Sequence, residues 1–251
     1  MTTQNQTAII IPARYGSSRL EGKPLLKANN KPIIQWVWEK AKAVPKVDRV
    51  IVATDDERIF NACKEFGAEV EMTSTEHKSG SDRIAEVARR HPEIGYIINL
   101  QGDEPLIEQE NIELVIKGVL EDEQADISTL VRLIEDMDEV NNPNLVKCVF
   151  DVNNYAMYFS RSKIPFERGA NENNSQGRWK FYGHLGIYGF KRDAILKMTE
   201  LPQAPYEMAE SLEQLRALQN GMKIKVGIVE NVPVGIDTME DFEKFKAMVE
   251  G

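Results

Sequence analysis

The chain of 251 residues is long enough to bury a sizeable core, as one large or two small domains. Apolar residues make up 42% and charged residues 28%, a globular balance that excludes disordered, collagenous and coiled-coil proteins. The formal net charge of -9 argues against nucleic acid as a partner, because binding to its phosphates needs excess positive charge. A local basic patch remains compatible with that overall charge.

Short apolar runs alternate with helical patterns in the first hundred residues. The runs at 8–11, 49–53 and 96–100 are typical of strands that are buried on both faces. Helical patterns lie between and after them, at 32–38, 56–66 and 79–90. This order predicts an α/β fold with a doubly wound, mainly parallel sheet.

The pattern changes from about Val146. Strand-like runs follow one another with little helix between them, at 146–152, 156–160 and 180–190, around a polar loop at 171–177. Helical patterns then return at 191–199, 206–220 and 239–249, around an apolar strand at 223–229. We therefore expect a single domain over 1–251 with an inserted β-rich lobe at about 146–190, which would serve oligomerisation or substrate closure.

The sequence favours a soluble, cytoplasmic protein without a membrane partner. Its first seven residues are polar and uncharged, and the apolar run that follows is too short for a signal peptide or a membrane span. Cys63 and Cys148 lie far apart with no CxxC motif and are predicted to be reduced, although pairing stays open. His77, His91 and His184 are not at metal-ligand spacing, which argues against a zinc site.

The loop after the first predicted strand concentrates positive charge. Between Pro12 and Pro24 it carries Arg14, Arg19 and Lys23, and its two glycines allow backbone N–H groups to approach a ligand. Ligands of open α/β sheets bind at the carboxyl ends of the strands, where this loop lies. Cations and bare amides at such a place predict a phosphate cradle, against the alternative of a solvated surface loop.

This loop matches neither of the common phosphate-binding motifs. Gly16 and Gly22 have five residues between them, whereas a Walker A loop has four, and Pro24 follows Lys23 where that motif needs Ser or Thr. The spacing also differs from the G-x-G-x-x-G of dinucleotide binders. Kinase, ATPase and dehydrogenase functions are disfavoured accordingly.

Two aspartates are candidate metal ligands. Asp103 follows the third predicted strand, and Asp237 lies in a turn before the last helix. Magnesium usually takes only one or two protein carboxylates together with substrate phosphates, so such a pair suits Mg²⁺ at a nucleotide. By position alone, Asp237 is equally well placed to cap the helix that begins near Met239.

Eight segments in chain order resemble the 3-deoxy-manno-octulosonate (Kdo) cytidylyltransferase family, also called CMP-Kdo synthetases. They are IIPARYGSSRLEGKP from Ile10, VATDDERI from Val52, SGSDR from Ser79, NLQGDEP from Asn99, YFSRSKIP from Tyr158, HLGIYGF from His184, SLEQLR from Ser211 and GIDT from Gly235. A single block such as SLEQLR is a weak signal. Eight blocks over nearly the whole chain are a specific one, and they imply a nucleotide-diphospho-sugar transferase-like fold.

The resemblance assigns roles to the matching positions. It implies that Arg14, Arg19 and Lys23 hold the CTP triphosphate and, with Asp103, form the catalytic set. Cytidine would lie against Thr54, Asp55, Ser79 and Gly80. Asp103 and Asp237 would bind Mg²⁺, which favours the metal role of Asp237 over the capping role.

The same comparison implies a site for the acid sugar. Its expected contacts are Gln101, Arg161, His184, Tyr188, Glu207 and Glu210, with Arg161 as the bidentate partner of the carboxylate. By the residues alone, His184 reads as a structural histidine. Glu207, Glu210 and Glu213 are spaced as a solvated charged face of one helix.

The implied reaction joins CTP and Kdo to give CMP-Kdo and pyrophosphate for lipopolysaccharide synthesis. The sugar hydroxyl would attack the α-phosphorus in line with the leaving pyrophosphate, with positioning and charge stabilisation as the main contributions. Bound Mg²⁺ would lower the pKa of that hydroxyl. No side-chain base is identified, and a homodimer is implied by the family.

Departures from the family pattern leave alternatives open. Glu21 stands where the family usually has Pro, Ser211 where it has Met, and Gly183 where it often has Arg. A polar residue gained and a cation lost near the sugar would suit 8-amino-3,8-dideoxy-manno-octulosonate, whose ammonium group a nearby cation repels. A cytidylyltransferase for another acid sugar such as sialic acid, a sugar-phosphate nucleotidyltransferase and a non-catalytic nucleotide-binding scaffold are the remaining hypotheses.

Overall fold

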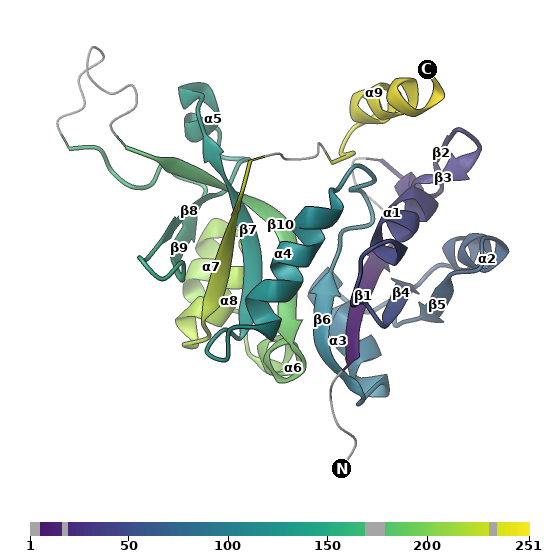
Figure 1. Cartoon of the computed structure of the whole chain (residues 1–251), viewed down its shortest axis with the longest axis horizontal. Helices are drawn as coiled ribbons and strands as arrows, with labels where there is room; N and C mark the ends of the chain where they lie inside the picture. Colours follow the sequence, from purple (N-terminus) through teal and green to yellow (C-terminus); the bar gives the residue numbers. More distant parts are fainter. Residues whose placement is uncertain (1–5, 17–19, 169–178, 231–234) are drawn as a thin grey trace.

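The computed structural model of the chain describes residues 6–16, 20–168, 179–230 and 235–251 (Figure 1). The predicted polar loop at 171–177 and Arg19 lie outside these residues. The central sheet has the order β11-β7-β10-β6-β1-β4-β5. Its strands are β1 (Gln6–Ala13), β4 (Arg49–Thr54), β5 (Glu69–Met72), β6 (Ile94–Asn99), β7 (Ile127–Ile134), β10 (Phe181–Lys191) and β11 (Ile224–Val229).

Strand β1 illustrates why the first half of the sheet is parallel and buried on both faces. It pairs in parallel with β4 on one side and with β6 on the other. Ile9 and Ile11 pack into the core on one face, while Ala8 and Ile10 pack into a second core on the opposite face. The apolar run that predicted this strand is therefore apolar because both faces are covered.

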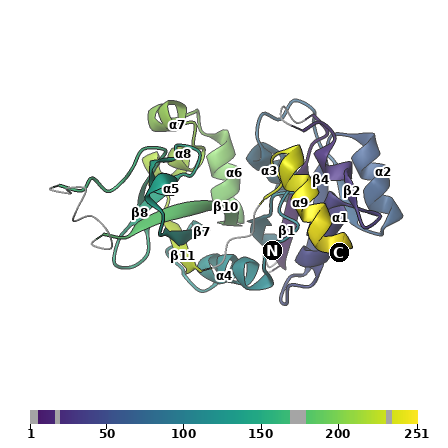
Figure 2. The same ribbon diagram turned by 90° about the horizontal axis from the view of Figure 1, so that it is seen from above.

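Helices cover both faces of the sheet, as a doubly wound fold requires. One core holds side chains from α1 (Ile33–Lys42), α2 (Glu57–Glu65), α4 (Gln109–Leu120) and α9 (Met239–Glu250). The other core holds side chains from α3 (Gly80–Arg90), α6 (Arg192–Glu200) and α8 (Gln214–Gln219). Figure 2 shows α9 lying beside α1, where Trp36 and Phe245 pack edge to face with centroids 5.8 Å apart.

Strand β10 joins the two halves of the molecule. It lies antiparallel to β6 on one side and antiparallel to β7 on the other, while β7 and β11 are parallel. Residues 181–190 were expected in the inserted lobe, but they form this central strand, because Phe190 and Gly189 fit the register of β6 and β7. The hairpin of β8 (Lys147–Phe150) and β9 (Ala156–Ser160) extends from β10.

Local signals account for several helix boundaries. The Asp56 side chain accepts a hydrogen bond from the Arg58 N–H and caps α2, and Gly67 follows that helix in the left-handed region at φ +81°. Ser79 and Asp82 form a capping box at the start of α3. These helix positions were predicted from the sequence and are confirmed.

The predicted helix at 206–220 is wrong in one respect. The chain forms two helices there, α7 (Pro205–Glu210) and α8, because Ser211 takes a left-handed conformation at φ 52°. The region between 104 and 145 carried no predicted element, yet it contains α4, β7 and the short α5 (Met137–Asn141). The remaining short elements are η1 (Lys23–Leu25), β2 (Lys27–Ala28) and β3 (Lys31–Pro32).

No helix in the described ranges is long and apolar enough to span a membrane. Cys63 and Cys148 are both free and buried. Burial raises the pKa of the Cys63 thiol to about 12 and raises the pKa of Cys148 as well. Both thiols are therefore unreactive core groups, as the sequence predicted.

The close contact of α4 with β10 gives a stability prediction. A Cβ at Gly189 would lie 2.5 Å from the Ser128 Oγ and 3.1 Å from the Val115 carbonyl oxygen. Ser128 cannot move away freely, because its hydroxyl donates to that same carbonyl at 2.6 Å. We expect Gly189→Ala to lower the free energy of unfolding by about 1–3 kcal/mol. Gly186→Ala on the same strand is the control, because a Cβ at Gly186 would have no atom within 4 Å. An equal loss of stability for both variants, measured by thermal unfolding, contradicts the prediction.

Candidate active site

The predicted site residues converge where parallel strands end. Strands β1, β4 and β6 run in the same direction, so the segments that follow Ala13, Thr54 and Asn99 emerge at one edge of the sheet. The start of α3 lies at the same edge, because a Cβ at Gly80 would contact the Pro12 ring at 3.5 Å. Gly102 also lies close to Pro12, because a Cβ at Gly102 would be 3.1 Å from the Pro12 carbonyl oxygen.

Lys23 is held at this edge by the geometry of its loop. Gly22 is left-handed at φ 68°, donates to the Tyr15 carbonyl at 2.9 Å and lies beneath the Tyr15 ring. The Lys23 Nζ then donates to Asp103 Oδ2 at 2.6 Å and to the Ile236 carbonyl at 2.7 Å. Asp237 Oδ1 lies 3.6 Å from the same nitrogen.

The two aspartates that were predicted to bind metal therefore face one cation together. Two carboxylate groups and a backbone carbonyl are the hard oxygen donors that Mg²⁺ prefers. Asp237 does not cap the last helix: the Thr238 side chain does, in a capping box with Asp241. The donor set fits Mg²⁺ bound through one or two carboxylates, and nowhere in the described chain do three or more His, Cys, Asp or Glu side chains form a metal cluster.

A further carboxyl group adds to the negative charge there. Burial, together with the smaller effects of the charges of Asp103 and Asp237, raises the pKa of Glu104 to about 7. No role was predicted for Glu104, although it stands directly after Asp103. Its environment shows that this corner of the protein disfavours additional negative charge unless a cation is near.

A cavity of about 220 Å³, here called the Arg14 hollow, opens beside this cluster. Its walls come from the end of β1, the start of α3 and the loop after β6, and its lining residues include Arg14, Lys78, Ser79, Gly80, Arg83 and Gln101. It unites Arg14 with the residues predicted to contact cytidine at the start of α3. Lys78 is a second cation here that the sequence analysis missed.

Thr54 and Asp55 lie behind the wall of the Arg14 hollow. Asp55 accepts from Arg83 Nη2 at 2.6 Å, and the other end of that guanidinium donates to Thr73. Thr73 in turn bonds the Thr54 carbonyl through both its N–H and its hydroxyl. Arg83 is only 4% exposed, so this network fixes α3 to the ends of β4 and β5. Arg83 is part of the quoted SGSDR segment but had no predicted role.

A second cavity of about 140 Å³, here called the Tyr188 hollow, continues from the first. Gly80 and Gln101 line both cavities, and Tyr188, Asn99, Glu213 and Gln214 line only the second. Tyr188 stands opposite Asn99 in the β10–β6 register, which places it next to the strand end that leads to Gln101. The structure thus brings two expected sugar contacts, Gln101 and Tyr188, next to the expected nucleotide contacts.

The side chains of Arg161 and Glu210 each form a hydrogen bond with the backbone of the other residue. Glu210 accepts from the Ser160 hydroxyl at 2.7 Å and from the Arg161 N–H at 2.9 Å. The Arg161 guanidinium donates to the backbone carbonyls of Glu210, Pro143 and Ser211. In this arrangement both side chains join the end of β9 to α7, and their predicted contact with the sugar stays a prediction.

His184 is partly buried and packs against neighbouring side chains. Its Nε2 lies 3.0 Å from the Thr129 hydroxyl, and its ring packs against Phe159 and Tyr188. Desolvation by burial lowers the pKa of His184 to about 3, so the ring is neutral at physiological pH. These contacts describe a structural histidine that supports Tyr188 from behind; direct contact with the sugar remains a prediction.

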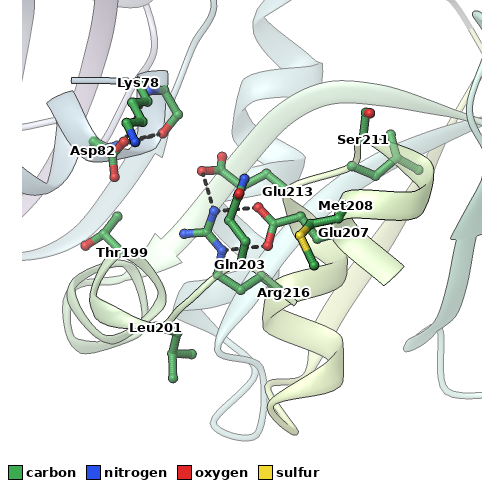
Figure 3. Close-up of a pocket in the computed structure, with 12 residues that line it drawn as sticks. Lys78, Asp82, Thr199, Leu201, Gln203, Glu207, Met208, Ser211, Glu213 and Arg216 are labelled. Carbon is green, nitrogen blue, oxygen red and sulfur yellow. Dashed lines mark hydrogen bonds and ion pairs between the residues drawn. The ribbon is translucent and has the colours of Figure 1, made fainter. Parts of the chain in front are cut away.

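Glu207 does not lie on the solvated face that its spacing suggests, and its predicted contact with the sugar stays a prediction. It is 4% exposed rather than on a solvated face, because the break at Ser211 turns α7 so that this residue points inward. Its carboxylate accepts from Arg216 Nε at 2.8 Å and from the Ala204 N–H at 2.9 Å. The side chain lies at the wall of a third cavity of about 730 Å³, the Arg216 cavity, which Figure 3 shows.

Two departures from the family pattern have different surroundings. Ser211 lines the Arg216 cavity together with Glu213. Gly183 instead faces apolar side chains: a Cβ there would lie 3.0 Å from Leu145 and 3.3 Å from Ile134. The structure therefore places the Ser211 change beside polar groups of the site, and the Gly183 change against a small apolar cluster.

The chain is similar to known cytidylyltransferases. A family model described as "Cytidylyltransferase" matches residues 8–224. The chain is 49% identical to the 3-deoxy-manno-octulosonate cytidylyltransferase of Thermodesulfovibrio yellowstonii, over 94% of this chain and 95% of the relative. It is also 49% identical to the protein of that name in Parabacteroides distasonis, over 96% of each.

Solved structures give the same result for the fold. A structure described as CMP:2-keto-3-deoxy-manno-octonic acid synthetase complexed with CTP superposes with a TM-score of 0.91 at 41% identity, over 98% of each chain. A cytidylyltransferase from Leptospira borgpetersenii superposes with a TM-score of 0.63 at 21% identity, covering 98% of this chain and 87% of the other. The second likeness concerns the fold alone. The predicted doubly wound, mainly parallel sheet is confirmed.

The low pKa of His184 predicts a pH dependence of stability. In the unfolded chain the His184 ring binds a proton below about pH 6.5. In the folded chain the ring stays neutral down to about pH 3. Stability is therefore complete above pH 6.5 and falls as pH falls, by about 1–2 kcal/mol at pH 5 for a group with some solvent access. We expect His184→Asn to show a smaller loss of melting temperature between pH 7 and pH 5. An unchanged pH dependence in that variant contradicts the assignment.

Proposed function

The chain belongs to the cytidylyltransferase family, and on this premise we propose that it transfers the cytidylyl group of CTP to Kdo, giving CMP-Kdo and pyrophosphate. One observation supports this most directly: the Arg14 hollow and the Tyr188 hollow meet at Gly80 and Gln101. A reaction between two bound substrates needs their sites to be adjacent. The names of the relatives and the CTP complex of the similar structure agree with it.

The cations of the site suit a triphosphate. Arg14 and Lys78 line the Arg14 hollow, and Lys23 lies at the adjacent strand end. Backbone N–H groups at the start of α3 add positive potential at the same wall. We propose that these groups bind the phosphates and that Lys23 stabilises the charge that builds up on the departing pyrophosphate.

Asp103 and Asp237 are the residues that would hold Mg²⁺. The metal, when bound, supplies positive charge to the phosphates and lowers the pKa of a hydroxyl that it contacts. The chain itself contributes the placement of both carboxylates: Asp103 through the end of β6, and Asp237 through the segment before α9. The Asp103 carbonyl accepts the Ile236 N–H at 2.9 Å, which ties these two segments together.

The Tyr188 hollow is the proposed site of the acid sugar. Gln101 and Gln214 supply amide groups for hydroxyls, and the Tyr188 ring and Ile127 supply apolar contact. The reacting hydroxyl would be brought beside Gln101, where the two hollows join. No side chain is assigned as general base, and catalysis in this proposal consists of binding, orientation and charge stabilisation.

We extend the proposal to the setting of the reaction. A homodimer formed through the β8–β9 lobe is supported by the exposed side chains of Met157, Phe166 and Trp179. A cytoplasmic location is supported by two free, buried cysteines and by a nucleotide substrate. The product would serve lipopolysaccharide synthesis.

An 8-amino analogue of Kdo is the second candidate substrate. One observation favours it: Ser211 puts a polar side chain at the wall of the Arg216 cavity, where the carboxylates of Asp82, Glu207 and Glu213 outnumber the cations Lys78 and Arg216. Gly183 gives no support, because it packs against Leu145 and Ile134.

Pyrophosphate release tests the function. With Kdo as the acceptor, we expect turnover with CTP and at least a tenfold lower rate with UTP or ATP. The reason is that the residues expected to contact cytidine would fit the base of CTP better than the other bases. The same assay with the 8-amino sugar ranks the two candidates. Binding of CTP without pyrophosphate release from either sugar contradicts the proposal and supports a nucleotide-binding scaffold.

Asp103→Asn tests the metal assignment. The substitution keeps the size of the side chain but removes the charge that faces Lys23 and the metal, so we expect turnover to fall at least 10³-fold with an unchanged circular dichroism spectrum. Asp138→Asn on the exposed side of α5 is the matched control and should keep full activity. Near-normal turnover of Asp103→Asn at saturating Mg²⁺ would sink the assignment.

A further inference from the structure

We infer that Glu207 and Arg216 are positioning residues, which act on the sugar by fixing the carboxylate of Glu213 at the wall of the Tyr188 hollow. Figure 3 shows the three side chains joined by ion pairs at one side of the Arg216 cavity. The inference rests on the proposed function and gives a role to two groups that do not themselves need to touch the substrate.

The pair of Glu207 and Arg216 is buried and almost completely satisfied. Arg216 is 8% exposed and donates to Glu207 through two nitrogens, Nε at 2.8 Å and Nη2 at 2.5 Å. Burial alone would raise the pKa of Glu207, but the guanidinium and the Ala204 N–H hold that pKa below its usual value. The two-point contact fixes the plane of the guanidinium, which a single contact would leave free to rotate.

Besides Glu207, the fixed guanidinium reaches two further parts of the chain. Its Nη1 donates to the Met198 carbonyl at 3.3 Å, which joins it to α6. Its Nη2 lies 3.8 Å from Oε1 of Glu213, the residue that starts α8. Arg216 therefore ties α6, α7 and α8 together at one point, and Glu213 is the charged member of this group that lines the Tyr188 hollow.

Glu213 is shared between the protein and the hollow. Its Oε2 accepts from the Ser81 hydroxyl at 2.6 Å, next to Gly80 at the wall of both hollows. Its Oε1 is buried and, among the atoms that the structure describes, accepts no hydrogen bond. A buried carboxylate oxygen without a donor is costly unless a ligand supplies one, and a sugar hydroxyl is such a donor.

The break between α7 and α8 makes this arrangement possible. In one continuous helix, Glu207, Glu210 and Glu213 would lie along the same side. The left-handed Ser211 instead separates Glu213 from the helix that carries Glu207 and Glu210, and the three carboxylates meet different partners, which are Ser81, Arg216 and Ser160 respectively. Only Glu213 keeps an oxygen for a ligand.

The test is a double-mutant cycle that joins Arg216→Lys and Glu213→Gln. Lysine keeps the charge but loses the planar two-point contact, and glutamine keeps the oxygen that accepts from Ser81. We expect Arg216→Lys to raise the KM for the sugar about tenfold, with KM for CTP and kcat within about twofold. In the Glu213→Gln background, the same substitution should change the sugar KM less than about twofold, because the group it positions has gone.

Further variants separate positioning from general stability. Glu207→Gln should reproduce the sugar KM effect of Arg216→Lys and be equally silent in the Glu213→Gln background; it also serves where Arg216→Lys fails to fold. Arg49→Lys is the matched control, because Arg49 forms ion pairs with Glu69 and Glu93 at the opposite edge of the sheet. That variant should leave both KM values unchanged.

The outcomes are distinct. Equal effects of Arg216→Lys in both backgrounds, or an equal rise in both KM values, would overturn the positioning role while leaving the proposed function in place. Absence of turnover by the unmodified chain, with Kdo and with its 8-amino analogue, contradicts the proposed function and the positioning role with it. Non-additive effects confined to the sugar KM support both.

Discussion

The hydrogen-bonded register between β10 and β6 is the constraint on which the site depends. Strand β10 belongs to the C-terminal half and pairs with β7 on its other side, so it joins two sets of parallel strands through antiparallel contacts. The pairing of Tyr188 with Asn99 puts a side chain of one half beside the strand end of the other. A shift of that register by one residue would turn Tyr188 to the other face of the sheet and separate the two hollows.

The charge at the candidate site differs from the net charge of the whole molecule. A chain with a net charge of -9 gathers several cations and the start of one helix at the Arg14 hollow, the proposed place of the triphosphate. Acidic residues occupy the same corner, where Asp103 and Asp237 face Lys23 and the pKa of Glu104 is raised. In the proposed function, these neighbouring positive and negative groups are the ones that would bind the phosphates and Mg²⁺.

Local sequence patterns predicted the parts of the fold that local interactions determine. The apolar run of β1 and the caps at Asp56 and Ser79 were sufficient for their elements, because burial on both faces and capping are visible in a few adjacent residues. The place of β10 was not predictable in this way, because its partners are distant in sequence. The same holds for β7, whose burial is set by neighbours on both sides.

The candidate site likewise has residues that the sequence could predict and residues that it could not. The resemblance to a family pointed to Arg14, Ser79, Gly80 and Gln101, which the structure brings together at the Arg14 hollow. It gave no sign that Arg83 joins this wall to Asp55, or that Glu207 pairs with Arg216. These roles depend on which way a side chain points after a helix breaks, and a spacing of three residues cannot reveal a left-handed turn at Ser211.

The turn at Ser211 has a consequence for how this enzyme family can change over evolution. Three carboxylates within seven residues each meet a separate partner, so a single inserted or deleted residue between α7 and α8 would misdirect at least two of them at once. Length changes are therefore expected to be rare in this segment, although surface turns usually tolerate them. Adaptation to a different sugar would proceed here by exchange of side chains on an unchanged backbone.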